Sequence, residues 1–84
     1  MRHPRPGELH RLASLLAQLR AIELLTERKE GVFYRRSKAF LHFHIDGDDF
    51  FADVRLDGAQ FDRMRVTTAA EQRRLVQSVK RVCA

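Results

Sequence analysis

The residues from Phe40 to Leu56 constrain the fold of this chain more than any other segment. Two extended stretches with alternating side-chain character, joined by the short turn at 46–49, predict an antiparallel β-hairpin. Because successive side chains of a strand point to opposite faces, each face has its own chemistry. The predicted core face carries Leu41, Phe43, Ile45, Phe50, Ala52, Val54 and Leu56. The opposite, outer face carries Phe40, His42, His44, Phe51, Asp53 and Arg55.

The segments around this hairpin predict a small α+β fold. Leucine spacing predicts a helix over about residues 8–30, with Gly31 as its left-handed C-cap. Residues 32–36 add a third strand, and 60–66 form a loop or a short fourth edge strand. Thr68 and Glu71 match a capping box before a second helix. The expected fold is an antiparallel three- to four-stranded meander flanked by an N-terminal and a C-terminal helix, in the order α-β-β-β-(β)-α.

Chain length and composition predict one domain and a cytoplasmic location. The 84 residues suffice for a single domain over 8–84, after a proline-rich leader over 1–7 that we expect to be disordered. No apolar run approaches the ~20 residues that span a bilayer, so no membrane partner is expected. A single cysteine, Cys83, excludes an intramolecular disulfide framework.

The outer face of the sheet is the predicted interface or ligand face. If Ser37-Lys38 forms the preceding turn, Tyr34 faces the core and Phe33 and Arg35 join the outer face. Three phenylalanines exposed together would favour self-association, so a homo-oligomer is the expected state. Alternatively, the first helix or the 59–66 segment covers this face and makes the phenylalanines core. The predicted face comprises Phe33, Arg35, Phe40, His42, His44, Phe51, Asp53 and Arg55.

A second interpretation is nucleic-acid binding. The net charge of +5 favours a polyanionic partner, and phenylalanines on an open sheet can stack on bases. Asp53 in the middle of the face and the lack of an RNP1 pattern count against it. The predicted phosphate contacts are Arg35, Arg36, Lys38 and Arg55.

A third interpretation is a divalent-metal site at His42, His44 and Asp53. The two histidines are two residues apart on one strand, so their side chains lie on the same face about 7 Å apart. Asp53 falls directly or diagonally across from His42, and two imidazoles with one carboxylate can bind zinc or non-haem iron. Alternatively the histidines are structural. An ion pair with Asp53 would then favour protonated His42 and make self-association sensitive to pH.

No catalytic centre and no other cofactor are predicted. The strand His42-Phe43-His44 resembles the one in HUH nucleases, but Tyr34, the only tyrosine, precedes it and cannot act as their nucleophile on a later helix. The order of helix, Glu27-Arg28-Lys29-Glu30-Gly31, strand and Lys38-Ala39-Phe40 is similar to small bacterial MmcQ/YjbR-like domains. That resemblance implies an α+β fold, sometimes described as DNA-binding, without established catalytic residues. The leading prediction is a non-catalytic association module.

Overall fold

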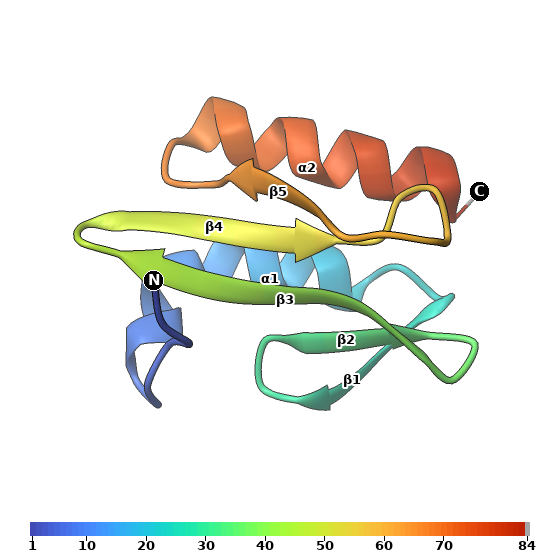
Figure 1. Cartoon of the computed structure of the whole chain (residues 1–84), viewed down its shortest axis with the longest axis horizontal. Helices are drawn as coiled ribbons and strands as arrows, with labels where there is room; N and C mark the ends of the chain where they lie inside the picture. Colours follow the sequence, from blue (N-terminus) through green and yellow to red (C-terminus); the bar gives the residue numbers. More distant parts are fainter. Residues whose placement is uncertain (84) are drawn as a thin grey trace.

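An antiparallel sheet of five strands and two α-helices make up the fold, so the α+β prediction is confirmed with five strands rather than three to four. The computed structural model describes residues 1–83 (Figure 1), and the predicted domain limit at residue 84 lies outside them. Strands adjacent in sequence are adjacent in the sheet. The elements are the 3₁₀ helix η1 (Glu8–Leu12), α1 (Ala13–Arg20), β1 (Leu25–Lys29), β2 (Val32–Arg35), β3 (Lys38–Asp46), β4 (Asp49–Val54), β5 (Asp62–Arg65) and α2 (Ala69–Val82).

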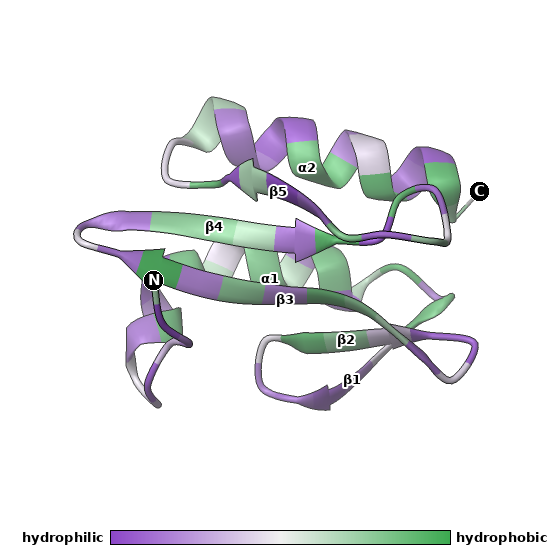
Figure 2. Ribbon diagram, in the orientation of Figure 1, coloured by the Kyte–Doolittle hydropathy of each residue, from purple (hydrophilic) through white to green (hydrophobic). Residues whose placement is uncertain are grey.

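The apolar core lies between one face of the sheet and the two helices. In Figure 1, α1 runs behind β3 and β4, and α2 contacts both α1 and β5. Hydrophobic and hydrophilic residues alternate along β3, as Figure 2 shows by colour. The predicted core face of the hairpin is confirmed, with Leu56 partly buried at its margin and the other six residues buried.

The predicted helix over residues 8–30 is wrong in its second half. α1 ends at Arg20, and the chain turns back as β1, which pairs with β2. Gly31, with a φ of 77°, forms the β1–β2 turn and does not cap a helix. The Arg20 guanidinium and the Gly31 N–H both donate to the Glu27 carboxylate, which ties β1 to α1. Leu25 is buried as the spacing requires, because alternation in a strand also places it on the core side.

The β2–β3 turn lies one residue earlier than the sequence predicts. Arg36 and Ser37 both have positive φ, as in a type I′ turn, and Arg35 pairs with Lys38. The predicted turn at Ser37-Lys38 is therefore one residue too late, which changes the pairing of β2 with β3 by two residues and by itself leaves every side chain on its predicted face. Phe33 pairs with Leu41 and is 1% exposed in the core, so its predicted position on the outer face is wrong.

A β-bulge in β3 moves Phe40, and with it Phe33 of β2, from the outer face to the core. Tyr34 pairs with Ala39 and Phe33 with Leu41, so Phe40 is an extra residue without a partner in β2. Phe40 is 3% exposed and belongs to the core cluster beside Leu41, which corrects its predicted position.

The C-terminal helix begins at the predicted capping box, which is confirmed. The Glu71 N–H donates to the Thr68 hydroxyl at 3.1 Å, and the Thr68 N–H donates to the Glu71 carboxylate at 2.9 Å. Arg65 at the end of β5 donates to Glu71 and to Asp49 at the start of β4. The hydrogen bond from Arg65 lowers the pKa of Glu71 to about 2. This network joins β4, β5 and α2 at one end of the sheet.

The N-terminal segment, residues 1–7, for which the sequence predicts a disordered leader, lies along β3 in the structure. Arg2 exchanges two backbone hydrogen bonds with Ile45, at 3.0 and 2.7 Å. The Arg2 guanidinium also donates to both carboxylate oxygens of Glu8 at 2.7 Å. The register of β2 with β3 extends only to the Phe33–Leu41 pair, so this segment occupies part of the β3 edge beyond β2. Within residues 1–83, neither helix has the length and apolar character needed to cross a bilayer.

The bulge predicts different costs for two phenylalanines that the sequence assigns to the same face. Phe40→Ala removes a core side chain and should lower the free energy of unfolding by about 3 kcal/mol or more. Phe51→Ala removes a half-buried ring from the outer face and should cost less. Urea denaturation of both variants measures the difference. A larger loss for Phe51→Ala would contradict the bulge.

Candidate metal centre

Polar side chains gather at the middle of the outer face, where β3 and β4 pair. His42 lies directly opposite Asp53, and His44 lies opposite Phe51. These four residues and Arg55 have the predicted placement. Arg35 does not, because its Nη2 donates to the Val82 carbonyl of α2 on the helix side. Phe33 and Phe40, as shown above, are also absent from this face.

Asp53 is the centre of the cluster. Among residues 1–83 it is the one charged residue in the buried class, with 8% of its surface exposed. One carboxylate oxygen, Oδ2, lies 2.8 Å from His44 Nε2 and 3.3 Å from His42 Nε2. The three potential ligand atoms all lie within 4.8 Å of one another. Two strands therefore bring two imidazoles and one carboxylate to a single point.

Arg63 on β5 orients the carboxylate from the side opposite the histidines. It pairs with Asp53 across the β4–β5 ladder and donates through Nε to Oδ1 at 2.7 Å and through Nη2 to Oδ2 at 2.9 Å. This bidentate pair is the main reason that the pKa of Asp53 lies below its usual value. Asp53 therefore stays ionised at neutral pH although it is buried.

The pKa of His42 is lowered, whereas the sequence suggested that Asp53 would raise it. Burial lowers its pKa below the usual 6.5, and this effect exceeds the opposing attraction of Asp53. The positive charge that His44 and His3 can carry lowers the pKa further. Asp53 does favour the protonated form of His42, as expected, but burial outweighs this effect, so the net shift of the His42 pKa is downward.

The loop after β4 covers His42 from outside. The Arg55 guanidinium donates to the Ala39 and Ala59 carbonyls and lies 4.2 Å from the ring centre of Phe61. The Phe61 ring in turn meets the His42 ring edge-on at 5.0 Å. Arg55, predicted as a phosphate contact, therefore has donors occupied within the fold and positions an aromatic cover over the cluster.

His3 is a third imidazole at this site, and sequence reasoning missed it together with Arg63 and Phe61. Its ring centre lies 4.7 Å from that of His44 and 6.0 Å from that of His42. His3 was missed because residues 1–7 were expected to be disordered, and Arg63 because its segment had no assigned register. The only signal in the sequence was that two further histidines, His3 and His10, had no role in the predicted core.

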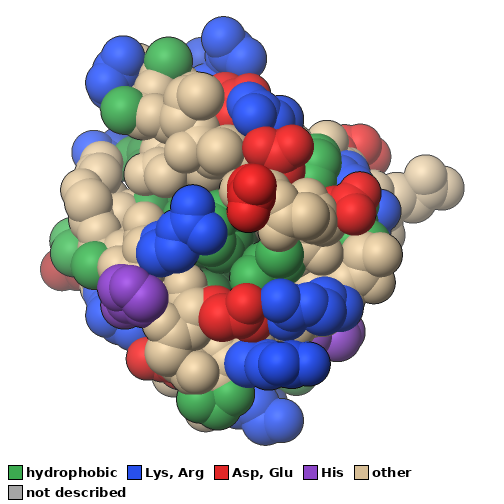
Figure 3. Space-filling view, turned by 90° about the vertical axis from the view of Figure 1, so that its left-hand side faces the viewer, with side chains coloured by type: hydrophobic (Ala, Val, Ile, Leu, Met, Phe, Trp, Pro, Cys, Tyr) green, Lys and Arg blue, Asp and Glu red, His purple; other side chains and the backbone are tan. Residues whose placement is uncertain are grey.

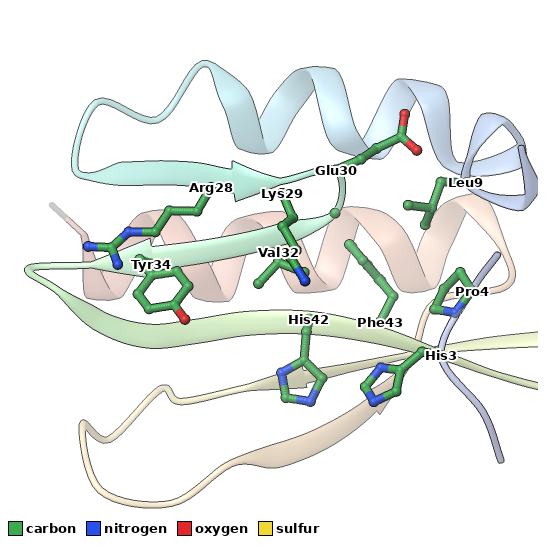
Figure 4. Close-up of a pocket in the computed structure, with 11 residues that line it drawn as sticks. His3, Pro4, Leu9, Arg28, Lys29, Glu30, Val32, Tyr34, His42 and Phe43 are labelled. Atoms are coloured by element: carbon green, nitrogen blue, oxygen red, sulfur yellow. The ribbon is translucent and has the colours of Figure 1, made fainter. Parts of the chain in front are cut away.

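A hollow of about 630 Å³ adjoins the cluster. It lies between the N-terminal segment, the β1–β2 turn and the middle of β3 (Figure 4). The rings of His42 and His3 lie beside each other at one side, and Tyr34 and Arg28 form the far side. The hollow therefore gives access to His3 and His42 from this side.

Charge on the remaining surface is mixed. Arg36 and Lys38, the other predicted phosphate contacts, are exposed at the β2–β3 turn. Figure 3 views the left-hand side of Figure 1, and it shows basic and acidic side chains interspersed rather than one field of positive charge. The structure brings the four predicted phosphate contacts to one end of β2 and β3, but Arg35 and Arg55 are engaged with backbone carbonyls there.

No protein-family model, curated protein or solved structure matches this chain. The resemblance to MmcQ/YjbR-like domains therefore stays a prediction from the sequence pattern. The function is therefore inferred from the geometry of the cluster itself.

The lowered pKa of His42 predicts a pH dependence of stability. The unfolded chain takes up a proton near pH 6.5 while folded His42 resists it, so stability is full above that pH and falls as the pH drops. Asp53, His44 and His3 are the titratable groups that face this ring. In a chelator-containing buffer, His42→Gln should flatten the loss of unfolding free energy between about pH 7.5 and about pH 5.5.

His10→Gln is the matched control, because His10 is exposed on η1 outside the cluster. The His10→Gln variant should lose as much free energy of unfolding as the parent chain when the pH falls over the same range. If the pH dependence of the free energy of unfolding is the same in His42→Gln as in the parent chain, this histidine is not buried as the structure places it.

Proposed function

We propose that this protein binds a divalent transition metal, with zinc as the best match, through His42, His44 and Asp53. The observation that supports the proposal is the convergence of both Nε2 atoms on one buried carboxylate oxygen. Imidazole nitrogen and carboxylate oxygen are common zinc ligands, and three protein ligands leave one further position.

The separations between the ligand atoms suit an ion at their centre. Zinc bonds to nitrogen or oxygen of about 2.0 to 2.2 Å in a tetrahedral site place neighbouring ligand atoms about 3.4 Å apart. The His42–Asp53 distance of 3.3 Å already has this value, and the His44–Asp53 distance of 2.8 Å would have to lengthen by about 0.6 Å. A side-chain adjustment of this size requires no change in the β3–β4 register.

Besides suitably spaced ligand atoms, a metal site needs imidazoles in the right protonation state and a carboxylate that is held in place. Binding through Nε2 needs neutral imidazoles with the remaining proton on Nδ1. Arg63 holds Asp53 through Oδ1, as outer partners of metal-binding carboxylates do, but its positive charge also repels a cation. The Arg63 side chain is 49% exposed, so it can release Oδ2 to the ion by turning toward solvent.

Self-association and nucleic-acid binding stay predictions with less support than the sequence suggested. Both depended on three outward phenylalanines, and of these only Phe51 lies on the outer face, half-buried. The ion cluster needs no such patch, because its ligands come from two paired strands of one chain.

Zinc titration of the tag-free chain tests the proposal. The parent protein should bind one equivalent of Zn²⁺ by calorimetry or chelator competition, and Mg²⁺, which prefers oxygen ligands and octahedral geometry, should not compete. His44→Ala and Asp53→Asn should each weaken the affinity at least about tenfold, because each removes one of three ligands. Zinc at about 100 times its Kd should raise the free energy of unfolding by about 2.7 kcal/mol.

His10→Ala is the control and should bind zinc like the parent chain. Circular dichroism identifies any variant that fails to fold, and the two variants alter different strands, so one folded variant suffices. Equal zinc affinity in a folded ligand variant and the parent would contradict the proposal.

A further inference from the structure

The N-terminal segment is fixed to the sheet on both sides of His3. On one side, Arg2 exchanges two backbone hydrogen bonds with Ile45. On the other, the Arg5 N–H donates to Glu8, whose carboxylate also receives the Arg2 guanidinium. The hydrogen bond from Arg2 is the main cause of a Glu8 pKa of about 2, so this clamp stays charged at neutral pH.

The register of this segment aims His3 at the cluster. Arg2 pairs with Ile45 in antiparallel sense, which places His3 across from His44. Residues opposite each other in an antiparallel pair project to the same face, and Ile45 projects into the core. His3 and His44 therefore share the outer face, where Figure 4 shows His3 beside His42.

The spacing of the three rings fits a common ion. Two imidazoles bound to one tetrahedral zinc have ring centres about 5 Å apart, given metal–nitrogen bonds of about 2.0 Å. The three distances among the rings of His3, His42 and His44 are 4.7, 5.0 and 6.0 Å. Within residues 1–83 no hydrogen bond holds the exposed His3 ring, so it can turn a nitrogen toward the ion.

From these contacts we infer that His3 is the fourth ligand, so that the metal locks the N-terminal segment onto the edge of β3. The inference rests on the proposed function, and it changes the class of the site. Three protein ligands leave a position for water, as in catalytic zinc sites, whereas four close the shell, as in structural sites. Since His3 and Pro4 also border the hollow next to the cluster, the bound ion would fix one wall of it.

The test compares Zn²⁺ binding and amide exchange in the full chain without an N-terminal tag. His3→Ala should weaken zinc binding at least about tenfold, and added imidazole should restore part of the loss by filling the vacated position. Zinc should slow exchange of the Ile45 amide, which donates to Arg2, in the parent chain but not in His3→Ala. His10→Ala, an exposed histidine on the adjoining η1, should behave like the parent in both measurements.

Two failures are distinguishable. Zinc affinity unchanged in His3→Ala, with Ile45 protected equally in both chains, overturns the fourth ligand and leaves the three-ligand site in place. Absence of zinc binding by the parent chain overturns both the site and the role of His3.

Discussion

The outer face of the sheet depends on the pairing of the buried Asp53 carboxylate with its neighbours on β3 and β5. An ionised group in the middle of a sheet is costly to bury unless it is paired. Arg63 supplies the permanent positive charge from β5, and His42 and His44 bring their Nε2 atoms to 3.3 and 2.8 Å from the carboxylate from β3. Because β4 lies between β3 and β5 in the sheet, Asp53 on β4 has the two histidines on one side and Arg63 on the other.

The edge of β3 adds a second constraint. Beyond the last pair with β2, this central strand would present unpaired backbone groups, and Arg2 fills part of that vacancy. The same two hydrogen bonds place His3 over the strand that carries His42 and His44. The N-terminal segment thus both pairs with the edge of β3 and brings His3 to the outer face. For this reason we link binding of the proposed metal to the position of this segment.

Much of the hairpin, and half of the candidate site, could be predicted from sequence. The alternation over 40–56 gave the β3–β4 pairing, which placed His42, His44 and Asp53 together, and local capping chemistry located the start of α2. The errors came from features without a local signal. One bulged residue in β3 moved both Phe33 and Phe40 into the core, and the β2–β3 turn lies one residue earlier than expected. The buried position of Leu25 suits a helix and the strand β1 equally, and the contribution of His3 depends on long-range pairing.

Anomalous diffraction at the zinc edge, from crystals grown with Zn²⁺, would locate an ion bound at this cluster. If His42, His44 and Asp53 bind zinc, one peak lies at about 2.0 to 2.2 Å from His42 Nε2, His44 Nε2 and an oxygen of Asp53, with the β3–β4 register unchanged. Crystals saturated with zinc that show no peak at this cluster, with both imidazoles still in contact with Asp53, would contradict the proposed site.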